Sequence, residues 1–193
     1  MSSLLPRVDR TEAQPTPAPD LSRIHHFTVR QLNENDGGAF KAIRLEALQV
    51  DGRYFGASYE EEAKLTSEQW RQRCRATEDH CIFGLLNNDK LIGVLEATKW
   101  PGDKEGKTVL WGAAYVNQNY REKGAATPLY VARLAWSKQR AQFNAAVFFI
   151  REGNRRSKEI HEKQGAIHTH DEPKRWADGT MAMAHWYRTE LRP

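Results

Sequence analysis

The chain has 193 residues, enough for one domain with a sizeable core. Its formal net charge of +4 is compatible with a polyanionic ligand but too small to indicate a nucleic-acid-binding protein. No apolar stretch approaches the roughly 20 residues that a membrane span requires. The two cysteines, Cys74 and Cys81, match no disulfide framework or zinc motif, so we expect reduced thiols and a cytoplasmic location. From the charge and the lack of a long apolar stretch we expect no nucleic-acid or membrane partner.

The first residues differ in composition from the rest of the chain. Pro15, Pro17 and Pro19 alternate with small or polar residues, which favours an extended segment without a packed core. We therefore expect a flexible, Pro-rich tail over residues 1–24 and a single domain over residues 25–193.

Hydrophobic periodicity predicts strands and helices in the order β-α-α-β-β-β-α-β-α-β-β. Strands are predicted over residues 27–32, 81–86, 91–98, 108–116 and 145–150, and again over 180–191 at the end of the chain. Helices are predicted over residues 40–48, 67–77, 127–142 and 154–164. Ser67, Thr127 and Asn154 are placed to cap the last three. The predicted fold is α/β (α+β), a mixed sheet with helices on both faces.

The turn between the strand at 108–116 and the following helix is suited to a phosphate group. The first turn of a helix presents unpaired N–H groups and the positive end of the helix dipole. Gly124 allows close approach of a ligand to the backbone, and Ala126 stays small. Arg121 and Lys123 add positive charge. We expect a pyrophosphate to bind here, although a tight turn with solvated charges has a similar sequence.

Two motifs resemble the signatures of the GNAT acetyltransferase superfamily. The sequence R-x-x-G-x-A at 121–126 is similar to that family's pyrophosphate loop, and N-x-x-S-x-x-I-H-E-K-x-G-A at 154–166 is similar to its second signature. The two motifs stand in the family's order, and the resemblance covers about residues 27–186. It implies a mostly antiparallel central sheet of about seven strands, and an N-acetyltransferase that uses acetyl-CoA and no metal.

The resemblance also implies which residues hold acetyl-CoA. The backbone of Tyr115 and Val116 is expected to bind the pantetheine arm as an added strand. Asn154, Ser157 and His161 are expected to line the thioester end. The pyrophosphate is expected beside Arg121, on the backbone amides of Glu122, Lys123, Gly124, Ala125, Ala126 and Thr127.

Acetyl transfer needs a proton donor for the departing thiolate and, for a charged amine, a general base. Many GNAT enzymes use a Tyr on the second-motif helix as the donor, and His161 stands at that position. The strand at 108–116 has no carboxylate, so Glu96 on the preceding strand is predicted as the base. The alternatives are a surface role for His161, a salt bridge for Glu96, and an ordered water or an already neutral amine in place of a base.

Aromatic and acidic side chains near the two variable regions suit a cationic substrate such as an amino sugar. The residues predicted to contact it are Tyr59, Glu61, Glu62, Trp111, Asp171 and Trp176. The acidic run at 60–62 has the alternative of being a solvated helix face. Taken whole, the chain resembles the aminoglycoside N-acetyltransferases that inactivate kasugamycin, which implies antibiotic resistance.

The sequence is compatible with two other functions, a protein lysine or N-terminal acetyltransferase and a non-catalytic acyl-CoA-binding sensor, and with a homodimer. His168 and His170 are expected to share one strand face, but without a third ligand at suitable spacing we predict no metal site.

Overall fold

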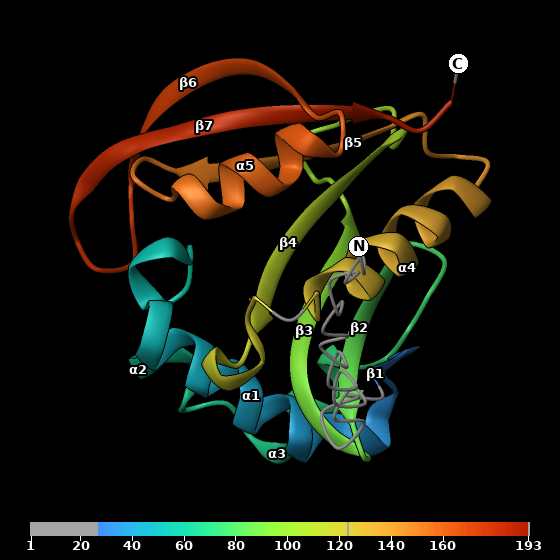
Figure 1. Ribbon diagram of the computed structural model, residues 1–193, viewed down its shortest axis with the longest axis vertical. Helices are drawn as coiled ribbons and strands as arrows, with labels where there is room; N and C mark the ends of the chain where they lie inside the picture. Colours follow the sequence, from blue (N-terminus) through green and yellow to red (C-terminus); the bar gives the residue numbers. More distant parts are fainter. Residues whose placement is uncertain (1–26, 123, 193) are drawn as a thin grey trace, which may run out of the picture.

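The computed structural model describes residues 27–122 and 124–192, and the predicted tail over residues 1–24 lies outside them. A seven-stranded sheet runs through the centre of the molecule, in the order β1-β2-β3-β4-β5-β7-β6 (Figure 1). The strands are β1 (Phe27–Gln31), β2 (His80–Asn87), β3 (Lys90–Lys99), β4 (Thr108–Val116), β5 (Ala145–Arg151), β6 (Ile167–Arg175) and β7 (Met181–Glu190). The helices are α1 (Gly37–Asp51), α2 (Tyr59–Glu62), α3 (Ser67–Arg73), α4 (Ala126–Gln139) and α5 (Arg155–Lys163), with short 3-10 turns η2 (Glu34–Asp36), η3 (Gly52–Tyr54) and η4 (Gln118–Tyr120).

The sheet is antiparallel except where β4 pairs with β5. This arrangement confirms the predicted mixed, mostly antiparallel sheet of seven strands. The parallel pairing spans only three positions, from Thr108 opposite Ala145 to Leu110 opposite Val147. Beyond Leu110 the two strands separate, which opens a split in the middle of the sheet.

Helices cover both faces of the sheet. α1 and α3 pack on β2, β3 and β4 around a cluster that includes Phe40, Trp70 and Ile82, and we call this side the α1 face. α4 packs on the opposite side, where Leu129 and Trp136 join the larger core. α5 lies on the same side as α4, and we call it the α4 face (Figure 1). None of the helices in residues 27–122 and 124–192 is long and apolar enough to cross a membrane.

Two predicted helix caps are displaced by a residue or more. Thr66, not Ser67, caps α3, because its side chain accepts from Gln69 N at 3.2 Å while Gln69 accepts from Thr66 N at 2.8 Å. Thr127 does not cap α4, because Gly124 turns the chain at a φ of +72° and the helix begins at Ala126. No described side chain caps this helix start, which leaves its first-turn amides for another partner.

Candidate active site

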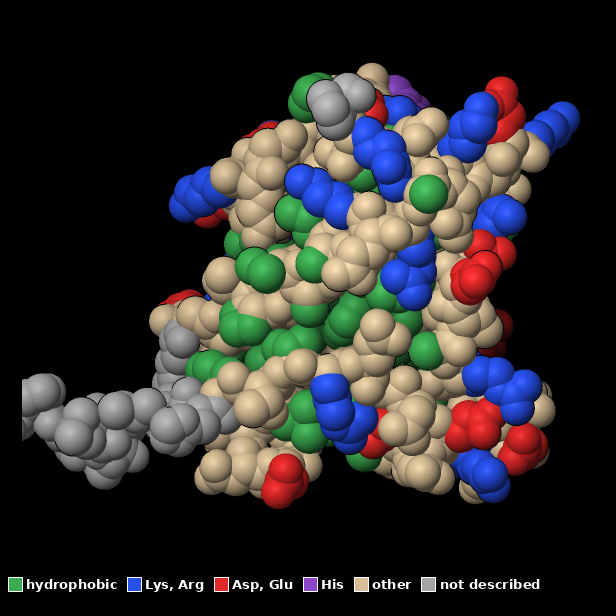
Figure 2. Space-filling model, turned by 90° about the vertical axis from the view of Figure 1, so that its right-hand side faces the viewer, with side chains coloured by type: hydrophobic (Ala, Val, Ile, Leu, Met, Phe, Trp, Pro, Cys, Tyr) green, Lys and Arg blue, Asp and Glu red, His purple; other side chains and the backbone are tan. Residues whose placement is uncertain are grey.

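A cavity of about 640 Å³ opens where β4 and β5 separate. Residues from β4, β5, the start of α4, α5 and the loop after α1 line it. Figure 2 looks onto the side that carries α4 and shows hydrophobic side chains across the middle of this face, with Lys and Arg side chains around them. Such a surface suits a ligand with an apolar arm and anionic groups.

β4 carries a bulge at the split. Its register against β3 advances three residues from Gly112 to Tyr115 while β3 advances two, from Val94 to Glu96. The extra residue is accommodated at Ala113, which has a φ of +51°, a conformation that costs energy for a residue with a Cβ. Ala113 lines the cavity. The bulge therefore changes the direction of the β4 backbone beside the ligand space, and only the run of small residues at 112–114 signals it in the sequence.

The predicted pyrophosphate loop has the backbone that an anion site needs. Gly124 adopts a left-handed conformation, and Ala125, Ala126 and Thr127 follow it into the first turn of α4. All four residues line the cavity, and so does Glu122. The predicted contact of Lys123 lies outside the described residues.

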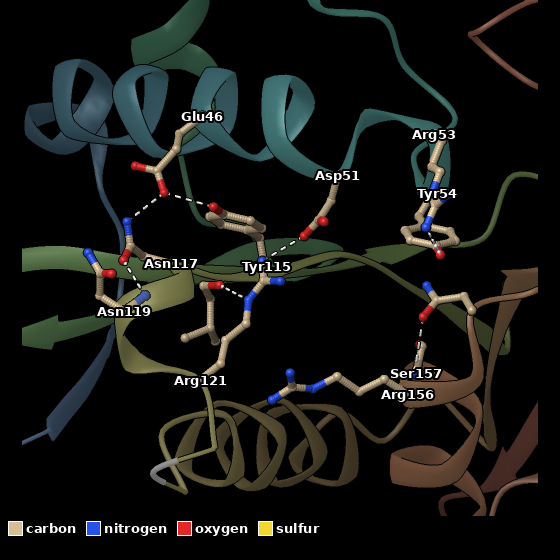
Figure 3. A network of polar contacts seen from close by, with 12 residues as sticks. Glu46, Asp51, Arg53, Tyr54, Tyr115, Asn117, Asn119, Arg121, Arg156 and Ser157 are labelled. Atoms are coloured by element: carbon tan, nitrogen blue, oxygen red, sulfur yellow. Dashed lines mark hydrogen bonds and ion pairs between the residues drawn. The ribbon is translucent and has the colours of Figure 1, made fainter.

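Arg121 makes specific contacts within the protein. Its Nε donates to the Val116 carbonyl at 2.8 Å and its Nη2 to Asp51 at 2.6 Å (Figure 3). Asp51 is the last residue of α1, so this pair fastens the end of α1 to the start of the loop. Arg121 therefore holds the loop in place, and it also lines the cavity.

A second contact ties α1 to the end of β4. Glu46 accepts from the Tyr115 hydroxyl at 2.7 Å and from Asn117 Nδ2 at 2.6 Å (Figure 3). Burial, together with the hydrogen bond to Glu46, raises the pKa of Tyr115 above its ordinary value. The Tyr115 side chain thus belongs to the α1 packing, while Tyr115 and Val116 both line the cavity and lie beyond the last β4–β5 pair. Sequence reasoning missed Glu46 and Asp51, whose partners are about 70 residues away.

α5 presents the second predicted motif to the cavity. The predicted cap is confirmed, since Asn154 Oδ1 accepts from Ser157 N at 3.2 Å. Both residues line the cavity. Arg156, which sequence reasoning did not single out, also lines the cavity and extends from α5 toward α4 (Figure 3). Its Nη1 lies 3.6 Å from Glu122 Oε1.

His161 is buried in the cavity wall, at 5% exposure, and is not a surface side chain. Its ring packs against Phe148 and Tyr130, with centroids 4.3 Å and 5.2 Å away. Burial, reinforced by the positive charge of Arg133, lowers the pKa of His161 to about 4. The ring is therefore neutral at neutral pH, and its Nδ1, 2.7 Å from the Ser157 carbonyl, carries the proton. In this arrangement Nε2 is an acceptor, and protonation of His161 is required before it can act as the predicted acid.

Glu96 lies on the α1 face of β3, outside the residues that line the cavity. It pairs in register with Gly112 of β4, which does line it, and cross-strand partners share a face of the sheet. Its carboxylate is 3.5 Å from His80 Nδ1, the contact that the salt-bridge alternative anticipated. Glu96 therefore stands one strand away from the split, over the α1 face.

The predicted substrate residues are dispersed. Glu62 is buried and bonded to Arg44 at 2.9 Å and to Arg73, so it joins α1 to α3. Trp111 lines the cavity on the α4 face, while Trp176 is buried and donates to a backbone carbonyl. Tyr59 and Glu61 lie on α2, and Asp171 lies on β6, all outside the cavity lining.

An aromatic row that the sequence did not reveal crosses the α1 face beyond the split. It consists of Trp100, Phe149, Trp176 and Trp186. Phe149 and Trp186 pair in register on β5 and β7, with ring centroids 5.0 Å apart, and Trp100 lies 5.7 Å from Trp186. Phe149 lines the cavity. Glu172 accepts from Trp186 Nε1 at 2.8 Å, so an acidic group borders the row.

The expectation that His168 and His170 share a strand face is wrong. A bulge between them shifts the register, so that His168 pairs with Tyr187 and His170 with Trp186. Asp171 Oδ1 instead lies 2.6 Å from His168 Nε2 and 2.7 Å from Nδ1 of His185. These three residues form an exposed group of metal-ligand type, which pairing with β7 brings together. In the structure the carboxylate serves the two imidazoles as a shared hydrogen-bond acceptor.

The comparisons agree with this geometry. The sequence model of the acetyltransferase (GNAT) family matches residues 44–166, nearly two thirds of the chain. The chain belongs to the GNAT acetyltransferase family. A search among curated protein sequences finds no significant match. As a GNAT member the protein is an acetyl-CoA-dependent N-acetyltransferase.

Solved structures show the same fold at low sequence identity. A GNAT acetyltransferase from Streptococcus pneumoniae superposes with a TM-score of 0.74 at 12% identity, over 86% of this chain and 99% of that one. YncA from Salmonella typhimurium, solved with its cofactor acetyl-CoA, gives 0.73 at 16% identity, over 87% and 95%. The ribosomal-protein-S18-alanine N-acetyltransferase from Escherichia coli gives 0.63 at 14% identity, over 86% and 95%.

The GNAT cosubstrate fits the residues present. The uncapped start of α4 and the left-handed Gly124 provide amides for a pyrophosphate, and the free edge of β4 beyond Leu110 provides backbone groups for an amide-containing arm. Arg156 and Arg121 add positive charge on two sides of the cavity.

Proposed function

We propose that this GNAT enzyme acetylates an amine of a small cationic substrate, an aminoglycoside such as kasugamycin. The observation that carries the proposal is the aromatic row on the α1 face, which reaches the cavity at Phe149. Aromatic faces attract cations and cover the apolar faces of sugar rings, and carboxylates bind ammonium groups. Glu172, which borders the row, and Glu96, which pairs with Gly112 on the same face, are the carboxylates proposed for this role.

In this proposal acetyl-CoA binds on the α4 face of the sheet and the acceptor amine on the α1 face. α4 and α5 cover the α4 face and carry the groups for acetyl-CoA, which supplies the thioester. The acceptor amine then approaches from the α1 face, over Gly112, where the split gives access to the same space. Both Gly112 and Phe149 line the cavity, so the acceptor surface and the cosubstrate space are continuous.

In this proposal Glu96, the cross-strand partner of Gly112, receives the proton that the amine must lose before attack, directly or through a water molecule. The bulge at Ala113 is the part of β4 suited to aim a backbone N–H at the carbonyl oxygen as it becomes an oxyanion. Modification of an aminoglycoside in this way would confer resistance, and a cytoplasmic location would bring enzyme, drug and acetyl-CoA together.

The proposal is tested by release of free CoA, measured with a thiol reagent, from acetyl-CoA and a panel of aminoglycosides that includes kasugamycin. A lysine peptide and an N-terminal peptide serve as matched amine controls. Turnover on an aminoglycoside and a mass increase of one acetyl group on the drug are expected. Turnover only on the peptides would replace the proposal with a protein acetyltransferase. Acetyl-CoA binding without turnover on any acceptor would favour the sensor.

A further inference from the structure

Arg133 on α4 is a buried cation with no counter-ion among the described residues. The residue is 1% exposed, and its Nε and Nη2 have no hydrogen-bond partner within the described residues. No salt bridge of Arg133 is found in residues 27–122 and 124–192. Burial lowers its pKa to about 10, so the guanidinium is still charged at neutral pH. A buried charge without a counter-ion costs several kcal/mol, which points to an anion that arrives with the ligand.

The position of Arg133 is fixed at the narrow end of the split. Its guanidinium carbon lies 4.3 Å from the Trp111 ring centroid and 5.2 Å from that of Tyr130. Trp111 is the first β4 residue after the last β4–β5 pair, and both it and Arg133 line the cavity. Trp111 Nε1 donates to Ser137 Oγ, which donates to the Arg133 carbonyl, so this part of the wall is tied together.

The other ionisable groups packed around Arg133 carry no negative charge at neutral pH. Burial raises the pKa of Tyr130, and it raises that of Cys81 on β2 to about 12. His161 on α5 is neutral, for the reasons given above. Arg156 on α5 is a second cation that acts electrostatically on Tyr130, and its Nη1 lies 3.6 Å from Glu122 Oε1. The narrow end of the cavity is therefore electropositive and has no proton donor poised at His161 Nε2.

The reaction of this family produces an anion in such a place. The amine nitrogen attacks the thioester carbonyl carbon, the N–C bond forms and the C–S bond breaks. The bonding electron pair leaves with sulfur, and the amine proton passes to a base on the acceptor side. We propose that Arg133 stabilises the coenzyme A thiolate as it departs, so that no protein acid needs to protonate the sulfur. The thiolate then takes its proton from solvent.

This inference rests on the use of acetyl-CoA, not on the identity of the acceptor, so its test needs no acceptor. The thiol of bound coenzyme A is titrated by the ultraviolet absorbance of its thiolate, in the wild-type protein and in Arg133→Met. In the wild type we expect the thiol pKa to lie at least about one unit below that of free coenzyme A, a tenfold change in ionisation constant. Arg133→Met should abolish that shift, and Arg133→Lys, which keeps the charge, should retain part of it. An equal thiol pKa in wild type and Arg133→Met overturns the proposal.

Binding of desulfo-coenzyme A, which lacks the sulfur, separates this role from a contact with the pantetheine arm. Equal affinity for it in wild type and Arg133→Met is expected, whereas a loss equal to the loss for coenzyme A overturns the proposal. Thermal melting of the ligand-free proteins checks the fold. Met fills similar volume without a buried charge, so Arg133→Met should melt at the same or a higher temperature. If Arg133→Met does not fold, the same two measurements on Arg133→Lys and Arg133→Gln decide, since only Lys should lower the thiol pKa.

Discussion

Glu96 and Gly112 face each other across the β3–β4 ladder, and the space that a side chain at position 112 would occupy is empty. Within the described residues, no heavy atom outside its chain neighbours lies within 4 Å of where a Gly112 Cβ would be. A carboxylate thus borders bare backbone at the point where β4 begins its bulge. Because that backbone also lines the cavity, this is where we propose that the acceptor amine reaches the bound thioester.

Filling this space should block the acceptor without disturbing the cosubstrate. We expect Gly112→Val to lower kcat/KM for the amine roughly a hundredfold, because small displacements of a reacting group have effects of that size. The Kd for acetyl-CoA, measured by calorimetry, should change little, and Gly112→Ala should show a smaller defect than Val. A loss of acetyl-CoA affinity with acceptor kinetics intact would place the acceptor elsewhere.

Glu96→Gln tests the proposed base. Removal of a general base lowers turnover by roughly 10²–10⁴-fold, and we expect a loss in that range with an unchanged KM for acetyl-CoA. His80→Ala is the matched control, because it removes the 3.5 Å contact to Glu96 while leaving the carboxylate in place. Equal losses in both variants would indicate a structural salt bridge, and full activity in Glu96→Gln would exclude Glu96 as the base.

The aromatic row predicts where substrate affinity resides. Trp186→Leu removes the ring that contacts both Phe149 and Trp100, and we expect a roughly tenfold rise in KM for the amine substrate, in line with one lost cation–π or stacking contact. Val131→Ala, at an exposed position of α4, is the control and should leave all kinetic constants unchanged. An unchanged KM in Trp186→Leu would remove the row from the acceptor site.

The Arg121–Asp51 pair should strengthen the binding of acetyl-CoA. Asp51→Asn releases the end of α1 from the loop that precedes α4, so we expect acetyl-CoA to bind about tenfold more weakly, about 1.4 kcal/mol. Asp36→Asn breaks a comparable pair with Arg30 away from the cavity and should leave acetyl-CoA affinity unchanged. The Kd of both variants is measured by calorimetry, and a similar loss in both would point to a general effect on the fold.

Glu62 predicts a specific acid sensitivity of the fold. Burial alone would raise the pKa of Glu62, but hydrogen bonds from Arg44 and Arg73 outweigh it and the pKa is lowered from the ordinary value of 4.5. A group whose folded pKa is depressed stabilises the fold above the unfolded pKa and loses that contribution as pH falls through the folded one. The free energy of unfolding in urea should therefore fall below about pH 4.5, and part of this fall should be absent in Glu62→Gln.

Glu62→Ala leaves the buried Arg44 guanidinium without its carboxylate. We expect this to cost about 3–5 kcal/mol at neutral pH. Glu60→Ala, at an exposed position of the same short helix, is the control and should change stability little. A loss below about 1 kcal/mol in Glu62→Ala would show that the pair contributes no more than a surface ion pair.

Several local features of this protein could be predicted from the sequence alone. Asn88 and Asp89, residue types that tolerate left-handed backbone, adopt φ angles of +48° and +64° between the predicted strands at 81–86 and 91–98, and Asn154 caps α5 as expected. Gly124 turns the chain into α4, within the motif that indicated the family. These features depend on residues a few positions apart, so composition and spacing contain the information. The GNAT assignment and the cosubstrate followed from them.

The acceptor side and the charges inside the cavity were decided by tertiary packing. Glu62, predicted to bind substrate, accepts a hydrogen bond from Arg44, 18 residues earlier in the chain. Trp100 contacts Trp186 only because β7 pairs with β5. The bulge that separates the faces of His168 and His170 depends on pairing with β7. Arg133 is unremarkable in a helix sequence and becomes significant only when Trp111 and His161 enclose it. Burial and partner choice are properties of contacts between distant segments, and those contacts exist only once the sheet has formed.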